Sequence, residues 1–255
     1  MKILALETTG RYGSAAVIDD DGRIFCASSA EEMNHLRGMI SLIDEAVKKA
    51  GIRKEDLTHV AASAGPGSFT GIRIGVVTAR TMAQMLGLPC ISISSIEALA
   101  QGSLRRAAEE GAAYIVPVIN ARRHQTYAAV YSAAQDNQTL IPVLEEKQYM
   151  IEDLLEELKK IQAGYSGASA YFTGDGIDAY GDIIEDVMPA GSYLSAEEAV
   201  RYQNAEAVAA IALRKAEEGA TVAYDDLLPE YMRLAEAEQR LKAGTLSDRI
   251  RTAKV

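Results

Sequence analysis

The stretch ILALETTGRYGSAAVID, residues 3–19, places two apolar runs on either side of a short polar turn. A second stretch, IVPVINARRHQTYAAVY, residues 115–131, aligns with it without gaps. Few residues are identical, but apolar runs mostly fall on apolar runs and the polar turn falls on the polar turn. This internal repeat predicts a duplicated α/β fold with two lobes that face each other, each a mixed sheet flanked by helices.

The expected elements come in a similar order in the two halves. In the first half, periodicity predicts strands at 2–7, 14–19, 23–28, 58–64 and 90–94, and helices at 31–51, 71–87 and from 95 onward. In the second half, it predicts strands within 115–131, at 139–149 and at 170–174, and helices at 152–161, 178–187 and 196–218. We therefore expect an N-terminal lobe over 1–110, a C-terminal lobe over 111–239 and a basic tail at 240–255.

The bulk composition limits the classes of function. The chain carries a net charge of −10, and a protein so acidic grips a polyanion poorly because neutralised phosphates supply most of that affinity. Any nucleic acid would thus be held by a more basic partner. Cys26 and Cys90 lie in separate apolar runs, which favours buried thiols over a disulfide. The start is too short for a signal peptide and no apolar run nears the ~18 residues of a membrane span, so we expect a cytoplasmic protein with no membrane contact.

A glycine-rich loop, Gly65-Pro66-Gly67, lies between an expected strand and an expected helix, where many nucleotide-binding loops lie. Ile72 follows Gly71 where a P-loop would have lysine, and the third glycine comes one residue late for a dinucleotide fingerprint. Both nucleotide interpretations are therefore weak. The glycines allow a tight turn instead, with Ser68 or Thr70 as the helix cap.

The helix after this loop has small residues at every fourth position, Gly71, Gly75, Ala79 and Ala83, and these line one face. Such a face lets another backbone approach closely, either the chain's own sheet or a helix of another subunit. The preceding helix favours the second option, because it is apolar on more than one face: besides a first stripe it carries Met39, Leu42, Ala46 and Ala50.

Candidate catalytic residues are few. Glu7, Thr8 and Thr9 lie in the first polar turn, and Asp175 lies in a glycine turn of the second half, so these four residues could line a nucleotide cleft. Asn120 occupies the place in the second half that is nearest to Glu7, which removes a carboxylate pair across the cleft. The three histidines, His35, His59 and His124, share no metal-ligand spacing, so we expect no metal site.

Four stretches together resemble the bacterial TsaB (YeaZ) family: GPGSFTGIRIG (65–75), ILALETT (3–9), SSIEALA (94–100) and LPEYMR (228–233). The resemblance covers nearly the whole chain and implies the duplicated actin/sugar-kinase-like fold. It implies a role in making threonylcarbamoyladenosine beside the anticodon of certain tRNAs. The family commonly has an aspartate where this chain has Asn120.

The catalytic relative of that family, TsaD, carries a metal-binding H-x-x-x-H. Ser95 and Leu99 stand where those two histidines would be, and neither residue replaces an imidazole ligand. The resemblance thus implies a non-catalytic scaffold or activator that binds no cofactor by itself, with ATP and metal on partner subunits. The implied partners are TsaD, the ATPase TsaE and a second copy of this chain, with tRNA bound only through the complex.

The implied pairing surface is the N-terminal lobe, on the helices at 31–50 and 71–87. The residues that we expect in this interface are His35, Met39, Leu42, Ala46, Gly71, Gly75, Thr78 and Met82. The alternative is an actin-like ATPase or a small-molecule kinase that uses Glu7 and Asp175.

Overall fold

The computed structural model describes residues 1–29, 35–133, 139–165 and 167–232. The basic tail expected at 240–255 lies outside these residues. None of the helices in the described part of the chain is both long and apolar enough to cross a membrane.

The first sheet contains five strands in the order β3-β2-β1-β4-β5. Their bounds are Lys2–Glu7 (β1), Ser14–Asp19 (β2), Ile24–Ser28 (β3), His59–Gly65 (β4) and Cys90–Ser94 (β5). Strands β1, β2 and β3 pair antiparallel, whereas β4 pairs in parallel with β1 and β5. The sheet is mixed, as predicted.

The second sheet repeats this arrangement. It has the order β10-β9-β6-β7-β8, with bounds Tyr114–Asn120 (β6), Gln125–Ala133 (β7), Leu140–Met150 (β8), Ala170–Thr173 (β9) and Tyr193–Ser195 (β10). Read in the opposite direction, this order is β8-β7-β6-β9-β10, which corresponds strand by strand to β3-β2-β1-β4-β5 of the first sheet. Corresponding pairs of strands are antiparallel or parallel in both sheets. The repeat in the sequence is therefore a repeat in topology, and the predicted duplicated actin/sugar-kinase-like fold is confirmed.

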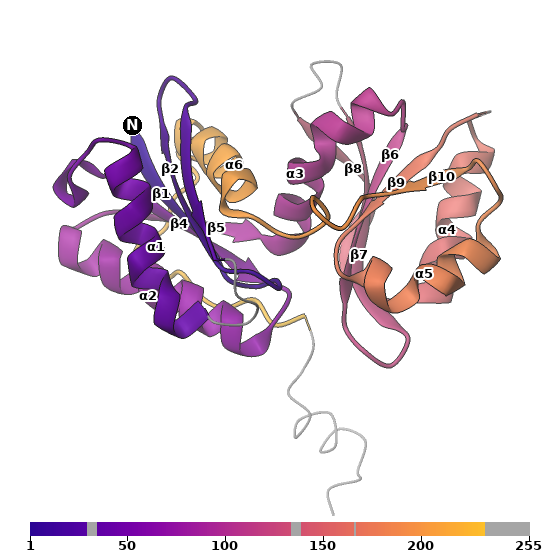
Figure 1. Cartoon of the computed structure of the whole chain (residues 1–255), viewed down its shortest axis with the longest axis horizontal. Coiled ribbons are helices and arrows are strands. Elements are labelled where there is room, and N and C mark those ends of the chain that lie inside the picture. Colours follow the sequence, from indigo (N-terminus) through magenta and orange to yellow (C-terminus); the bar gives the residue numbers. More distant parts are fainter. Residues whose placement is uncertain (30–34, 134–138, 166, 233–255) are drawn as a thin grey trace, which may run out of the picture.

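Two helices cover one face of the first sheet, α1 (His35–Lys49) and α2 (Phe69–Leu86). Alternate residues of β1, Leu4 and Leu6, share a core cluster with both helices, while Ile3 and Ala5 face the opposite side. A short 3₁₀ turn, Lys54–Asp56, follows α1. In the second lobe, α4 (Ile151–Ala163) and α5 (Gly176–Val187) flank the sheet. Figure 1 shows the two lobes side by side.

Each of the two remaining helices packs against the lobe to which its position in the sequence does not assign it. Helix α3 (Ser95–Glu109) precedes residue 110 in the chain, yet Leu99 and Leu104 belong to the core of the second sheet. Helix α6 (Ala205–Glu217) comes late in the chain, yet Val208 packs in the core behind β1 of the first sheet. Both helices lie between the sheets (Figure 1) and contact each other, so the lobes are joined by this helix pair as well as by two chain crossings.

The helix expected over 196–218 begins later than predicted. Asn204 caps α6, because its side chain accepts a hydrogen bond of 2.9 Å from the backbone N–H of Ala207. Residues 196–204 instead form the crossing from β10 to α6, and the backbone N–H of Ala196 bonds to the carbonyl of Phe172. The prediction was wrong for residues 196–204, since this segment is non-helical and runs from one lobe to the other, with Ala196 buried and Val200 exposed.

After α6, residues 218–232 return along the first lobe, and we call this segment the strap. Val222 pairs with Cys90 at the edge of β5, and Leu227 is fully buried in the core beneath α1 and α2. The backbone N–H of Glu230 donates a 2.7 Å hydrogen bond to the carbonyl of Ala64 in β4. The strap thus packs on the first lobe over most of its length, and Met232 at its end packs against the core of the second lobe.

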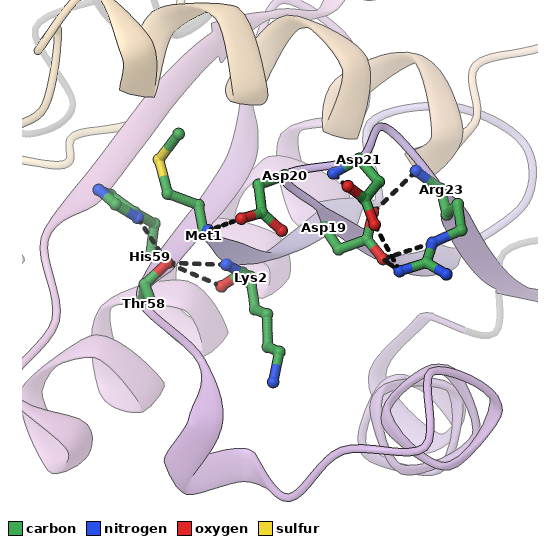
Figure 2. Close-up of polar contacts among 8 residues, drawn as sticks. All are labelled: Met1, Lys2, Asp19, Asp20, Asp21, Arg23, Thr58 and His59. Carbon is green, nitrogen blue, oxygen red and sulfur yellow. Dashed lines mark hydrogen bonds and ion pairs between the residues drawn. The ribbon is translucent and has the colours of Figure 1, made fainter.

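The second hairpin turn joins β2 to β3 through Asp20, Asp21 and Gly22. Gly22 has a φ of 77°, which completes a three-residue loop. Figure 2 shows Asp19 accepting bonds from the backbone and guanidinium of Arg23. These bonds lower the pKa of Asp19, although its partial desolvation acts in the opposite direction. The N-terminal amine lies 3.3 Å from Asp20. This end of the sheet carries a local ion-pair network that stays within the first lobe.

Candidate functional site

A cleft of about 870 Å³ opens between the lobes. Its walls come from the β1–β2 turn, the glycine loop and start of α2, the β6–β7 turn and the start of α5. The lining residues are Thr9, Gly10, Arg11, Gly67, Ser68, Phe69, Thr70, Ile119, Asn120, Ala121, Arg122, Tyr127, Asp175, Asp178 and Ala179. Of the four residues predicted for a nucleotide cleft, Thr9 and Asp175 line it, and Glu7 and Thr8 lie outside this lining.

Glu7 is fully buried beneath the β1–β2 turn. Its carboxylate accepts hydrogen bonds from the backbone N–H and the hydroxyl of Thr9 and from the hydroxyl of Ser63. Burial raises the pKa of Glu7 above its ordinary value, although these bonds act in the opposite direction. The side chain therefore holds the turn against β4.

The glycine loop packs against two other parts of the chain. Gly65 has a φ of 129°, and a Cβ there would lie 2.2 Å from the carbonyl oxygen of Glu230 in the strap. A Cβ on Gly67 would lie 2.6 Å from the carbonyl oxygen of Thr9, which also accepts a 2.9 Å bond from the N–H of Ser68. Ser68 caps α2, as predicted, by accepting from the N–H of Gly71 at 3.2 Å. Glycine is needed here for close internal packing.

The glycines of α2 also face inward. A Cβ on Gly71 would lie 1.9 Å from the carbonyl oxygen of Thr8, and a Cβ on Gly75 would lie 2.4 Å from the Thr8 hydroxyl oxygen. That hydroxyl donates a 2.7 Å hydrogen bond to the Gly71 carbonyl. Of the two packing options for this small-residue face, the structure shows contact with the chain's own β1–β2 turn.

In the second lobe, Asp175 stands at the start of α5 and accepts a 2.9 Å bond from the backbone N–H of Asn120. Desolvation raises its pKa. The Asn120 side chain accepts from the backbone N–H of Arg122 and from the hydroxyl of Tyr180. Both residues therefore shape the β6–β7 turn.

That turn has an unusual backbone. Arg122, Arg123 and His124 are consecutive and have φ values of 63°, 55° and 62°, a conformation that costs an L-residue about 1–2 kcal/mol. The His124 carbonyl accepts a 2.8 Å bond from the N–H of Ile151, and its ring lies 3.0 Å from Glu152. These contacts hold the turn at the cleft and place Arg122 in its lining. The sequence signals only the pair of arginines.

Most residues that were predicted for an interface are buried in the single chain. Met39, Leu42 and Ala46 belong to the core beneath α1, and Gly71 and Gly75 are buried as described above. Thr78 and Met82 are half-buried. The side chain of His35 lies outside the described part of the structure.

The expectation that Met39, Leu42 and Ala46 present a spare apolar face is therefore wrong for the single chain. The helix α1 buries positions 39, 42, 43, 46 and 47, which form one broad stripe of the usual helical spacing. Among the side chains of α1 that the structure describes, the exposed apolar one is Ile40, which is 66% exposed.

The exposed stripe on α2 was not predicted from the sequence. It consists of Phe69, Arg73, Val77, Thr81 and Met85, which follow every fourth position and are all exposed. Val77 is 60% and Met85 79% exposed, so with Ile40 they are the three most exposed aliphatic or Met side chains in the described part of the chain. The signal was present in the sequence, because this stripe has the same spacing as the glycine stripe and is offset from it by two residues, which places it on the opposite face of the helix.

Ser95 and Leu99, which the resemblance to the family matches with the two histidines of TsaD, lie on the first turns of α3 and are buried. Leu99 packs into the second-lobe core, where its Cδ2 approaches Gly174. His59 bonds to Thr58 at 2.9 Å (Figure 2), and burial together with the N-terminal amine lowers its pKa. Within residues 1–29, 35–133, 139–165 and 167–232, no group of three or more His, Cys, Asp or Glu side chains could hold a metal ion.

Comparison with solved structures supports the fold. The chain is similar to a structure of YeaZ from Pseudomonas aeruginosa, with a TM-score of 0.73 and 23% identity over 90% of this chain and 99% of that one. A second structure, an uncharacterised protein with similarity to peptidase YeaZ from P. aeruginosa, gives a TM-score of 0.74 at 22% identity over 91% and 99%.

Comparison with sequences identifies the family. The model described as TsaD, tRNA N6-adenosine threonylcarbamoyltransferase, matches residues 29–241. The chain is 29% identical to the tRNA threonylcarbamoyladenosine biosynthesis protein TsaB of Bacillus subtilis over 94% of this chain and 97% of that one. It is 32% identical to TsaB of Buchnera aphidicola (Schizaphis graminum) over 62% and 74%. With a sequence and a fold that both match, the chain belongs to the TsaB family, within the wider family that the TsaD model describes.

Proposed function

We propose that this protein is a non-catalytic scaffold and activator of TsaD in the synthesis of threonylcarbamoyladenosine in tRNA. Membership of the TsaB family supports a place in that biosynthesis. The protein pairs with TsaD through its N-terminal lobe and forms a homodimer when TsaD is absent. TsaE joins the complex, and tRNA is held through the other subunits, in the cytoplasm. ATP and the catalytic metal belong to the partners.

The non-catalytic role is supported by the side chains at the positions that matter for chemistry. Ser95 and Leu99 replace the two histidines of TsaD, and Leu99 is committed to the core. The alternative, an ATPase or kinase that uses Glu7 and Asp175, has less support. The Glu7 carboxylate is fully buried and already bonded to Thr9 and Ser63, so it is not free to place a metal in the cleft.

The observation that carries the proposal is the apolar surface on α1 and α2. These neighbouring helices expose Ile40, Val77 and Met85, although the same helices bury a complete stripe each in their own lobe. A soluble chain gains by covering such side chains, and burying each contributes roughly 1.5–3 kcal/mol. We therefore place the TsaD contact on this face, defined by Ile40, Val77 and Met85, and not on Met39, Leu42 or Ala46.

A matched pair of charge substitutions tests this placement. Val77→Glu puts a carboxylate on the proposed face, whereas Val200→Glu makes the same change at a valine of similar exposure, 52%, in the crossing before α6. Calorimetric titration against purified TsaD should show binding lost in Val77→Glu and retained in Val200→Glu, with both proteins folded by circular dichroism. Normal TsaD affinity of folded Val77→Glu and Met85→Glu variants would exclude this face.

A further inference from the structure

One arginine reaches across the cleft from the first lobe to the second. Arg11, in the β1–β2 turn, donates a 2.6 Å hydrogen bond from Nη1 to the hydroxyl of Tyr202. The same nitrogen lies 3.7 Å from Asp178 of α5 and 3.9 Å from Glu198. Its guanidinium also lies over the Tyr202 ring, 5.3 Å from the centroid. Arg11 thus contacts the second lobe by charge, hydrogen bond and stacking at once.

Asp178 is the second-lobe centre of this group. Its Oδ1 accepts a 2.6 Å bond from Arg201, and its Oδ2 accepts a 2.8 Å bond from the Tyr202 hydroxyl. The Tyr202 hydroxyl therefore accepts from Arg11 and donates to Asp178, so a continuous chain of hydrogen bonds links the two lobes. Such charge-assisted bonds are stronger than neutral ones.

The crossing from β10 to α6 fastens the same turn at further points. The Tyr12 and Tyr202 rings meet edge to face, with centroids 5.7 Å apart. The Ser14 hydroxyl accepts a 2.9 Å bond from the N–H of Ala205. Gln203 is buried against Gly10, where a Cβ would lie 2.4 Å from its Oε1. The turn and the crossing are therefore fitted to each other.

Arg11 and Asp178 both line the cleft between the lobes. In two-lobed proteins that open and close, a ligand in the cleft commonly bridges the lobes and selects the closed state. Here Arg11 and Asp178 bridge the lobes directly, and these are side chains that a ligand in the cleft would otherwise contact.

We propose that Arg11, Asp178 and Tyr202 form an interlobe clamp, which holds the two lobes at one angle without a bridging ligand. The body that presents the α1–α2 face is then rigid, and the cleft does not open and close with solutes. The clamp depends on the fold alone, so it stands or fails separately from the proposed binding to TsaD.

Pulsed electron paramagnetic resonance on the full chain tests the clamp. Spin labels at Lys54→Cys and Glu185→Cys, both exposed and in different lobes, report the distance between lobes, with Cys26→Ser removing the more accessible native thiol. The parent chain should give one narrow distance distribution, unchanged by magnesium with ATP or by inorganic phosphate. Arg11→Ala and Asp178→Asn should each broaden it, and Tyr202→Phe, which keeps the ring, should broaden it less.

Arg23→Ala is the matched control, because Arg23 pairs with Asp19 and Asp21 inside one lobe (Figure 2) and its loss should leave the distribution narrow. Circular dichroism confirms that each variant is folded. The clamp is refuted if folded Arg11→Ala and Asp178→Asn keep the parent distribution. It is also refuted if the parent distribution is broad or shifts with the added solutes.

Discussion

Adding one methyl group at Gly71 should destabilise the protein strongly. A Cβ at this position would lie 1.9 Å from the Thr8 carbonyl oxygen, whereas real Cβ contacts essentially never fall below 3.0 Å, so α2 and the β1–β2 turn must separate by about 1 Å. The obstacle is a backbone atom of a buried residue and cannot rotate away. Overpacking costs typically 1–3 kcal/mol and occasionally more.

Two further contributions nearly cancel. The shift strains the 2.7 Å bond from the Thr8 hydroxyl to the Gly71 carbonyl, worth about 1 kcal/mol, while alanine gains about 1 kcal/mol of helix propensity over glycine. We therefore expect Gly71→Ala to lose about 3 kcal/mol of unfolding free energy. For a chain of this size that lowers the melting temperature by about 6–12 °C.

Scanning calorimetry and urea unfolding measure the loss. Gly181→Ala is the matched control, since Gly181 lies within α5 with nothing within 4 Å of an added Cβ, and the same change there should raise stability by up to about 1 kcal/mol. A Gly71→Ala protein as stable as the parent would contradict internal packing of this glycine. A Gly71→Ala variant that is stable but fails to bind TsaD would instead support a role of Gly71 in a contact between subunits.

Two other substitutions and one labelling experiment test the packing of the first lobe. Leu227→Ala should lower the unfolding free energy by about 2–5 kcal/mol in urea unfolding, because it leaves a cavity at a fully buried site in the strap. A loss under about 1 kcal/mol would contradict the packing of the strap into the core. Burial raises the folded pKa of Glu7 above 4.5, so its carboxyl binds a proton more tightly in the folded state and stability falls as pH rises from about 4.5 through the raised value. Glu7→Gln should lessen that fall above pH 4.5, and stability profiles that run parallel for the parent and the variant would contradict it. Burial raises the pKa of Cys90 to about 11, so a disulfide reagent at pH 8 should modify Cys90 only after denaturation, and rapid labelling of folded protein would contradict this.

The repeat of residues 3–19 in residues 115–131 correctly predicted that the two lobes are built alike, because apolar alternation and polar turns are local features of sequence. The short edge strand β10 (Tyr193–Ser195) was not predicted. The exchange of α3 and α6 could not be predicted in the same way. Periodicity shows which face of a helix is buried, but not which of two sheets buries it, and both helices lie between sheets with apolar residues on more than one side.

The candidate site shows the same limit. Small residues at 71 and 75 correctly predicted a close approach to α2, and Ser68 was correctly one of two candidate caps. The identity of the approaching backbone, Thr8, depends on how β1 and β4 pair, which the spacing of the glycines does not encode. For α1, two apolar stripes suggested a spare face, yet one broad stripe was buried and Ile40 alone was left outside among its described apolar side chains.

Reconstitution of the modification reaction tests the proposed function most directly. Purified TsaD and TsaE, with tRNA, ATP and a threonylcarbamoyl donor, are assayed for threonylcarbamoyladenosine with and without this chain. We predict that product forms only when the chain is added, that Val77→Glu fails to support it while Val200→Glu succeeds, and that the chain alone forms none. Equal product in its absence, or product from the chain alone, would contradict a role as the non-catalytic activator of TsaD.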